Sequence, residues 1–190
     1  MNSLINGSDF LINAIFGLFI LFLLIRFWMH IFHMDFRNPI GNFLVQISNP
    51  LLLPFKQVIS SNRGFAVAIL SVSIITIAFK ILLLLSIQSH IPALTGLIIL
   101  VIAEFIKINI YIFIGAMIIR VVSSWIVPQG GYNPILAIAH TLSNPLTIPA
   151  RKIIPTISGI DLSPILILIV LQLGLIVIVN PLVNLGYSLA

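Results

Sequence analysis

Lys80, Glu104 and Lys107 are ionisable residues inside long apolar stretches of the sequence, where a charge is costly. Such residues are functional candidates, because each must be paired or must line a polar path. Glu104 and Lys107 are spaced i,i+3 and can pair on one face of a helix. Two interpretations follow: a Lys80–Glu104 bridge ties two segments together, or the three side chains form an intramembrane polar cluster along an ion pathway.

Metal, haem and enzyme chemistry find little support in the sequence. His30 and His33 are spaced i,i+3, but the chain has no cysteine, no HExxH motif and no acidic cluster near His90 or His140. It also lacks a GxSxG motif, a phosphate-binding glycine loop and paired carboxylates. We therefore expect no metal, no cofactor and no catalytic residues, and we expect the histidines to be hydrated or hydrogen-bonded.

The elements that hold these residues are those of a membrane protein. Of the 190 residues, 60% are hydrophobic and 7% are charged, whereas soluble domains carry about 25% charged residues. A membrane-spanning helix needs about 20 apolar residues, and four stretches qualify: about 9–32, 65–87, 100–126 and 163–184. We therefore predict an all-α membrane protein with about four transmembrane helices. Whether residues 91–103 form an extra short helix stays open.

An internal repeat organises the chain. NPIGNFLVQISNPLLLPFKQVI at 38–59 aligns without a gap with NPILAIAHTLSNPLTIPARKII at 133–154. The identical positions include the opening Asn-Pro-Ile and the contiguous phrase Ser-Asn-Pro-Leu. We therefore predict two halves, residues 1–95 and 96–190, each built as a helix, a proline-broken segment and a second helix.

Both proline-broken segments start with an Asn-Pro pair, at 38–39 and 133–134. An asparagine cap before a proline at the first helical position is a strong helix start. We predict that each helix ends at the second Asn-Pro pair, because proline disfavours helical geometry in the residue before it. Residues 51–53 and 146–148 should then be extended or turn-like. Such short, interrupted segments should lie in the membrane interface or dip into the protein.

Lysine and arginine are concentrated in and around these two segments, as Arg37, Lys56, Arg63, Arg151 and Lys152. By the positive-inside rule both segments face the cytoplasm and both termini face outward. An even number of spans in each half makes the repeats parallel. The net charge of +5 thus reflects topology rather than nucleic-acid binding. The five cations form a candidate cytoplasmic docking or lipid surface.

Two further arginines, Arg26 and Arg120, occupy matching places near the inner ends of the first and third spans. An interfacial arginine commonly extends its charged end to the headgroups. Alternatively, each guanidinium caps carbonyls or pairs with a carboxylate such as Asp35 or Asp161. Asp161 itself can cap the last helix, or it can meet Arg120 or Arg151.

The phrase NPILAIAHTLSNPLTIPARKIIPTISGIDLSP in the second half closely resembles the signature of the YggT family, also called YlmG, of small bacterial and plastid membrane proteins. The matching residues are Asn133, Pro134, Leu142, Asn144, Pro145, Leu146, Pro149, Arg151, Ile154, Pro155, Gly159, Asp161, Ser163 and Pro164, preceded by Arg120 and Trp125. The first half departs from this pattern after Lys56, where SSNRGFAVAI replaces the Pro-then-Gly-x-Asp phrase. A site that needs Asp161 is therefore not duplicated.

The resemblance implies a non-enzymatic, multi-pass protein of the bacterial inner membrane, without cofactors, that is connected with envelope organisation, division or osmotic-stress tolerance. Two functions fit. A scaffold or assembly factor would use the cytoplasmic cations to bind envelope or division proteins and anionic lipids. A small ion channel or transporter accessory, active against osmotic shock, would use the intramembrane polar cluster. It would form a homo-oligomer, because four spans enclose little space.

Overall fold

Helices make up nearly all of the structure. The computed structural model describes residues 2–56, 62–87, 93–126, 133–154 and 161–189. Within these ranges every regular element is helical: α1 (Asn2–Ile31), α2 (Pro39–Lys56), α3 (Asn62–Ile87), α4 (Leu94–Ile126), α5 (Pro134–Ile153), α6 (Ser163–Gly174), the π-helical turn η1 (Leu175–Val179) and α7 (Asn180–Ser188). Four stretches are long and apolar enough to cross a membrane: Ile5–Ile31, Gly64–Ile87, Leu94–Trp125 and Ser163–Ser188. The predicted all-α membrane fold with four spans is confirmed.

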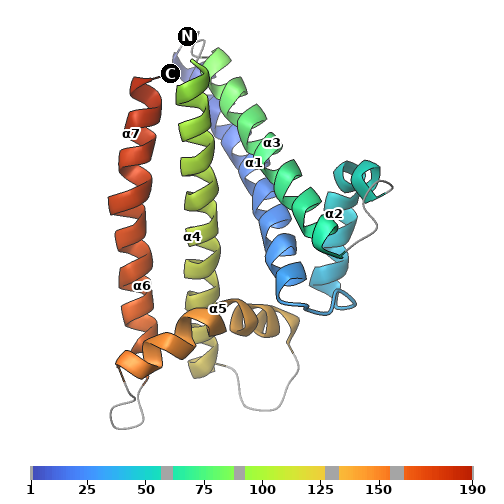
Figure 1. Ribbon diagram of the computed structural model, residues 1–190, viewed down its shortest axis with the longest axis vertical. Helices are drawn as coiled ribbons and strands as arrows, with labels where there is room; N and C mark the ends of the chain where they lie inside the picture. Colours follow the sequence, from blue (N-terminus) through green and yellow to red (C-terminus); the bar gives the residue numbers. More distant parts are fainter. Residues whose placement is uncertain (1, 57–61, 88–92, 127–132, 155–160, 190) are drawn as a thin grey trace.

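The arrangement of the helices separates two ends of the bundle (Figure 1). The spans α1, α3, α4 and α6–η1–α7 run from top to bottom, and both ends of the chain lie at the top. Helix α5 lies across the bottom of α4 and α6, while α2 packs beside the lower part of α1 and α3. We call these the terminal end and the α5 end. The termini share one end, as an even number of spans requires.

Helix α4 is longer than predicted. Its 33 residues correspond to about 50 Å at 1.5 Å per residue, which exceeds the roughly 30 Å of a bilayer core. Residues 94–103 belong to this helix, so the third span starts at Leu94 instead of about residue 100. No separate short helix precedes it within the part of the chain that the structure describes, while residues 91 and 92 lie outside that part.

The prediction that proline ends the helices α2 and α5 midway is wrong. Both helices continue through their internal prolines, so residues 51–53 and 146–148 are helical rather than extended. An internal proline costs about 3 kcal/mol, but Pro145 and Pro149 lie on the exposed face of α5. The opposite face is anchored by the buried residues Ile138, Ala139, Leu142, Ser143, Thr147 and Ala150. This tertiary anchoring outweighs the local cost, because helix stability in proteins comes mainly from packing one face.

The fourth span contains a local irregularity. After α6 the backbone follows the π-helical turn η1 for five residues and then resumes as α7. Pro181 stands at the start of α7 and has no backbone N–H to donate to the preceding turn. A π-turn next to a proline is one of the usual ways in which a helix absorbs a missing hydrogen bond. The span therefore remains continuous from Ser163 to Ser188.

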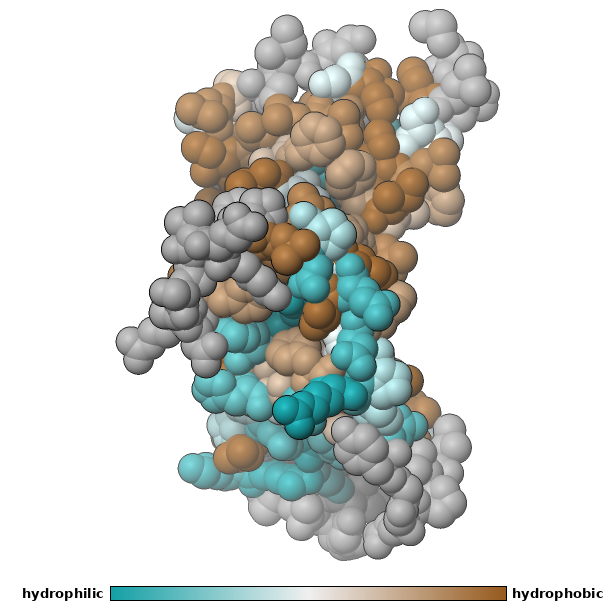
Figure 2. Space-filling model, turned by 90° about the vertical axis from the view of Figure 1, so that its right-hand side faces the viewer, coloured by the Kyte–Doolittle hydropathy of each residue, from teal (hydrophilic) through white to brown (hydrophobic). Residues whose placement is uncertain are grey.

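Apolar packing fills the middle of the bundle and links the two halves. One core cluster draws on the spans of both, with members that include Ile20, Leu24, Ile77, Ile81, Ile108 and Ile112. Many large apolar side chains on the spans remain exposed, as expected for helices that face lipid. Figure 2 shows the side of the molecule that is on the right in Figure 1. Hydrophobic residues cover the upper part of this face, and hydrophilic residues gather in the lower half.

Candidate functional site

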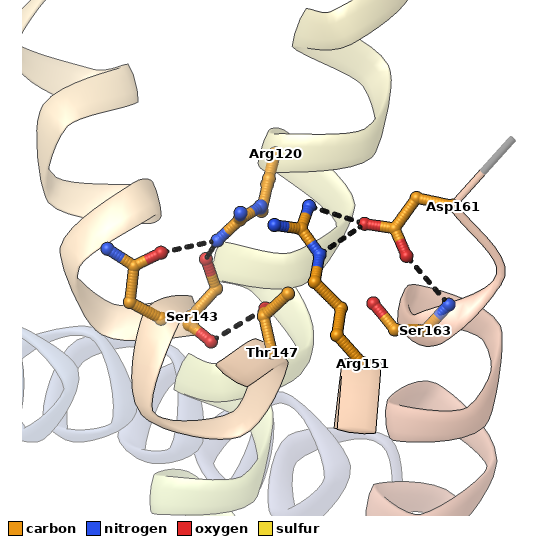
Figure 3. A network of polar contacts seen from close by, with 7 residues as sticks. Arg120, Ser143, Thr147, Arg151, Asp161 and Ser163 are labelled. Carbon is orange, nitrogen blue, oxygen red and sulfur yellow. Dashed lines mark hydrogen bonds and ion pairs between the residues drawn. The ribbon is translucent and has the colours of Figure 1, made fainter. Parts of the chain in front are cut away.

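Arg120 fastens the short helix α5 to the span α4. Its Nη1 donates to the Ser143 hydroxyl at 2.9 Å and to the Asn144 Oδ1 at 2.8 Å, as Figure 3 shows. Both acceptors belong to the repeated Ser-Asn-Pro-Leu phrase. Hydrogen bonds from a charged donor are stronger than neutral ones, so this contact sets the position of α5 next to Pro145.

Arg26 makes the corresponding contact in the first half. Its Nη1 donates to the Ser48 hydroxyl, and both Nη atoms lie 3.2 Å from Asn49 Oδ1. The predicted extension of this arginine to the headgroups is wrong, since Arg26 is only 2% exposed. Its guanidinium also lies 5.3 Å from the centre of the Phe65 ring. The helix α2 is therefore held to α1 by a buried version of the Arg120 contact.

Asp161 joins the end of α5 to the start of α6. Its Oδ2 accepts hydrogen bonds from Nε and Nη2 of Arg151, at 2.9 and 2.6 Å. Its Oδ1 accepts the backbone N–H of Ser163 at 3.0 Å, so it also caps the last span. Burial acts to raise the pKa of Asp161, but the hydrogen bonds from Ser163 and Arg151 outweigh it and leave the pKa below its usual value. Two of the roles predicted for Asp161 therefore occur together: it caps the last helix, and it pairs with Arg151.

These residues surround a pocket between α4, α5 and α6 with a volume of about 640 Å³. We call it the ionic pocket; it is lined by Arg120, Val121, Ser124, Trp125, His140, Arg151, Asp161, Leu162, Pro164, Ile165 and Leu168. One side carries two guanidinium groups, while the other is apolar. Partial burial and the charge of Arg120 lower the pKa of His140, which favours a neutral imidazole at neutral pH.

A matching pocket of about 440 Å³ occurs in the first half. Its lining residues are Phe27, His30, Ile31, His33, Ala66, Val67 and Leu70, and most stand 94 or 95 positions before a lining residue of the ionic pocket. Ala66 occupies the place of Asp161, and His30 occupies the place of Ser124. Among the residues whose side chains the structure describes, neither an arginine nor a carboxylate lines this pocket, so the described parts of the two sites differ in charge although they correspond in position.

A second polar site lies near the terminal end. Lys80 Nζ is 2.7 Å from Glu104 Oε1, and Lys107 pairs with the other carboxylate oxygen. The Lys80 and Glu104 side chains are 6% and 13% exposed. The three residues of the predicted polar cluster are thus brought together, beside a cavity of about 170 Å³ that Asp9, Asn13 and Tyr187 also line. Sequence reasoning missed these three, although the i,i+4 spacing of Asp9 and Asn13 in an apolar span was a signal for them.

The remaining predicted residues are distributed as follows. Asn133 caps α5, because its Oδ1 accepts the N–H of Ile135 at 2.9 Å with Pro134 at the helix start. Ser163 is buried and Pro164 starts α6, whereas Trp125 is 81% exposed.

The structure describes the side chains of only some cations of the predicted docking surface. Arg37 and Lys152 are exposed. Lys56 and Arg63 belong to α2 and α3, but their side chains, like Pro155, Gly159 and His90 as a whole, lie outside the described residues. Among the described residues no group of three His, Asp or Glu side chains could hold a metal ion.

Trp28 provides a further link that the sequence did not reveal. Its Nε1 donates to Asn109 Oδ1 at 2.7 Å and so connects α1 with α4. The Trp28 ring also packs edge-on against Phe113 with centres 5.0 Å apart. Together with the Lys80–Glu104 pair, this contact holds the two halves together.

Comparison with known proteins identifies the family. The family model described as CCB3/YggT matches residues 5–88 and again residues 99–182. The chain is 30% identical over 169 residues to a Vibrio alginolyticus protein named "Uncharacterized protein in proC 3'region", covering 88% of this chain and 90% of the relative. It is 31% identical to "Uncharacterized protein PA0392" of Pseudomonas aeruginosa over 95% of this chain and 92% of that one.

The Escherichia coli K12 protein named "Uncharacterized protein YggT" is 30% identical over 87% of this chain and 86% of its own. No solved structure matches. The match of the family model to most of the chain shows that this protein belongs to the CCB3/YggT family.

Proposed function

We propose that the protein is a non-enzymatic scaffold or assembly factor of the bacterial inner membrane, acting in envelope organisation, division or osmotic-stress tolerance. The observation that carries this proposal is the pair of short amphipathic helices α2 and α5, each fastened to a span by an arginine that donates to a Ser-Asn pair. A helix held in this way presents a preformed surface. A partner protein then binds without the cost of ordering that surface.

The outward face of α5 combines apolar and polar groups. Its exposed residues include Ile135, His140, Asn144, Pro145, Ile148, Pro149, Arg151, Lys152 and Ile153. Apolar side chains among polar ones at the edge of a bundle suit either the headgroup region or a partner helix. Prolines on this face limit the flexibility of the surface they form.

The exposed cations available for docking differ in whether they already pair with a carboxylate. Arg151 is engaged with Asp161 through two nitrogen atoms, so its removal would disturb the fold as well as the surface. Lys152 and Arg37 are exposed and form no ion pair within the described residues. Near an anionic surface each such cation contributes roughly 1 kcal/mol. These two residues are therefore the better choice for testing docking.

A channel or transporter accessory is the second candidate, and the polar cavity beside Lys80, Glu104 and Lys107 favours it. A conducting path would have to continue from there to the α5 end. Within the described residues a cluster of buried apolar side chains lies between the two ends, and it includes Leu24, Ile77, Ile108, Ile112 and Ala116. The buried Ser73 and Thr76 hydroxyls donate to carbonyls of their own helix. This apolar barrier supports the scaffold over the channel.

The decisive experiment is crosslinking in native membranes followed by identification of the captured proteins. The Arg37→Gln/Lys152→Gln double variant should lose partners that the unchanged protein captures. Lys107→Gln is the matched control, because it removes a cation at the opposite end, and it should keep those partners.

Ion flux from liposomes that contain the purified protein separates the two candidates. The scaffold predicts no flux under an osmotic gradient. Unchanged crosslinking in the double variant, together with a flux that Glu104→Gln alters, would establish the channel instead.

A further inference from the structure

The ionic pocket carries more positive than negative charge. Arg120 and Arg151 both line it, and among the described residues Asp161 is the one carboxylate in its lining. Arg151 uses Nε and Nη2 for Asp161, while Arg120 uses only Nη1 for Ser143 and Asn144. The other guanidinium nitrogens of these two residues have no hydrogen-bond acceptor within the described part of the chain. Guanidinium N–H groups at a membrane boundary need acceptors, and a planar fork of this kind suits phosphate oxygens.

Ser163 holds Asp161 beside the pocket. Its backbone N–H donates to Asp161 Oδ1 at 3.0 Å, and Figure 3 shows its side chain on the side of α6 that faces Arg151. The Ser163 side chain is fully buried and does not line the pocket. The donors that a ligand in the pocket can reach are therefore the guanidinium groups of Arg120 and Arg151.

The opposite side of the pocket indicates where the ligand comes from. Ile165 and Leu168 line it from α6, and Trp125 lines it from the end of α4. Ile165 is 57% and Trp125 is 81% exposed. Exposed apolar side chains on a span face lipid chains, and tryptophan is typical of the level of the headgroups. The pocket is therefore continuous with the surface that the bilayer covers, and its apolar side would offer nothing to a soluble anion.

We propose that the ionic pocket binds an anionic phospholipid, with the phosphate between Arg120 and Arg151 and an acyl chain along Ile165 and Leu168. A single excess positive charge favours a headgroup with a net negative charge over a zwitterionic one, whose own ammonium group would add a cation. The corresponding pocket of the first half has Ala66 and Val67 where the ionic pocket has Asp161 and Leu162, and no arginine lines it among the residues whose side chains the structure describes. The proposal deepens the scaffold function by naming a lipid partner, and it rests on that function.

Native mass spectrometry of the full chain tests the proposal. The purified, delipidated protein in a non-ionic detergent is offered equal amounts of phosphatidylglycerol and phosphatidylcholine. One phosphatidylglycerol should be retained preferentially, and Arg151→Gln should reduce that preference about tenfold, as the loss of one charged hydrogen bond implies. Lys107→Gln removes a cation near the terminal end, which does not line the ionic pocket, and should leave the preference unchanged.

Asp161→Asn distinguishes lipid binding from a structural role of the Arg151–Asp161 pair. It breaks the same ion pair as Arg151→Gln but keeps the guanidinium, so it should retain or increase the preference for phosphatidylglycerol. Equal loss in both variants, equal loss in Lys107→Gln, or no preference in the unchanged protein would overturn the proposal. Displacement of the lipid by millimolar inorganic phosphate would overturn the assignment to a lipid. The scaffold function is tested separately, by crosslinking of the Arg37→Gln/Lys152→Gln variant. The lipid proposal and the scaffold proposal can therefore be refuted independently of each other.

Discussion

Lys80 on α3 and Glu104 on α4 form an ion pair between the first and second halves of the chain, with 2.7 Å between Nζ and Oε1. Lys107 contacts the same carboxylate from one turn further along α4. Glu104 is therefore the shared counter-charge of two cations inside a membrane-spanning bundle. A buried charge that loses its partner is strongly destabilising, more than the pair itself is stabilising.

Glu104→Gln should therefore destabilise the bundle by about 3 kcal/mol, because it leaves Lys80 buried without a counter-charge. Lys107→Gln should cost much less, since the Lys107 side chain is 33% exposed and can reach water or headgroups. The midpoint of thermal unfolding in detergent measures both. The double variant Lys80→Met/Glu104→Gln should regain part of the loss, and an equal loss in all three variants would contradict this account.

The two arginine contacts allow a matched comparison. Ser48→Ala should cost about 1–3 kcal/mol, because Arg26 is 2% exposed and no water can replace the lost acceptor. Ser143→Ala should cost less, since Arg120 is only half-buried and water can replace the lost acceptor. Urea unfolding of the two variants under the same conditions measures the difference. A larger loss for Ser143→Ala would mean that the buried contact is not the stronger anchor of the two.

The spans could be predicted from composition because a bilayer demands about 20 apolar residues with all backbone groups satisfied internally. The start of α5 could likewise be predicted, since Asn133 supplies the cap and Pro134 the first helical residue. The Lys80–Glu104 contact was one of two interpretations, and few other partners exist for charges in apolar spans. The first two features depend on local sequence alone. The third could be anticipated because the apolar spans contain so few charged residues.

The continuation of α2 and α5 through their prolines could not be predicted in the same way. The local rule that proline disfavours a helix is outweighed by packing of the opposite face, which depends on residues far away in the sequence. The burial of Arg26 has the same origin. Its position near a span end suggests an interfacial side chain, but Ser48, Asn49 and the Phe65 ring enclose it from two other helices.

Gly41 permits the tight connection between α1 and α2. A Cβ added there would lie 2.7 Å from the Phe36 backbone, and backbone atoms cannot move aside cheaply. Gly41→Ala should therefore destabilise the protein although alanine favours helices. Gly115→Ala is the control, because nothing lies within 4 Å of a Cβ at that position in α4. It should be neutral or stabilising by up to about 1 kcal/mol. Thermal unfolding of the two variants checks this, and equal behaviour would show that the Phe36 contact imposes no constraint.

Acidification should weaken the ionic pocket in two separate steps. The pKa of His140 is lower in the folded protein than its ordinary 6.5, because of partial burial and then the charge of Arg120. The folded state thus disfavours the charged imidazole, and stability falls as the pH drops below 6.5 through the folded pKa. The pKa of Asp161 is held below its ordinary 3.8 by hydrogen bonds that outweigh burial. Its contribution is present above that value and is lost as the pH falls through the folded pKa.

The two steps can be separated by substitution. His140→Gln should remove the loss of stability that begins below pH 6.5 and leave the loss below pH 3.8. Asp161→Asn should do the reverse, and it should lower stability at neutral pH because Arg151 loses its partner. The thermal midpoint measured from pH 7.5 to pH 3 provides the comparison. If Asp161→Asn left the acid-induced loss unchanged, the Arg151–Asp161 pair would contribute nothing to the stability of the α5 end, since the lowered pKa is the measure of that contribution.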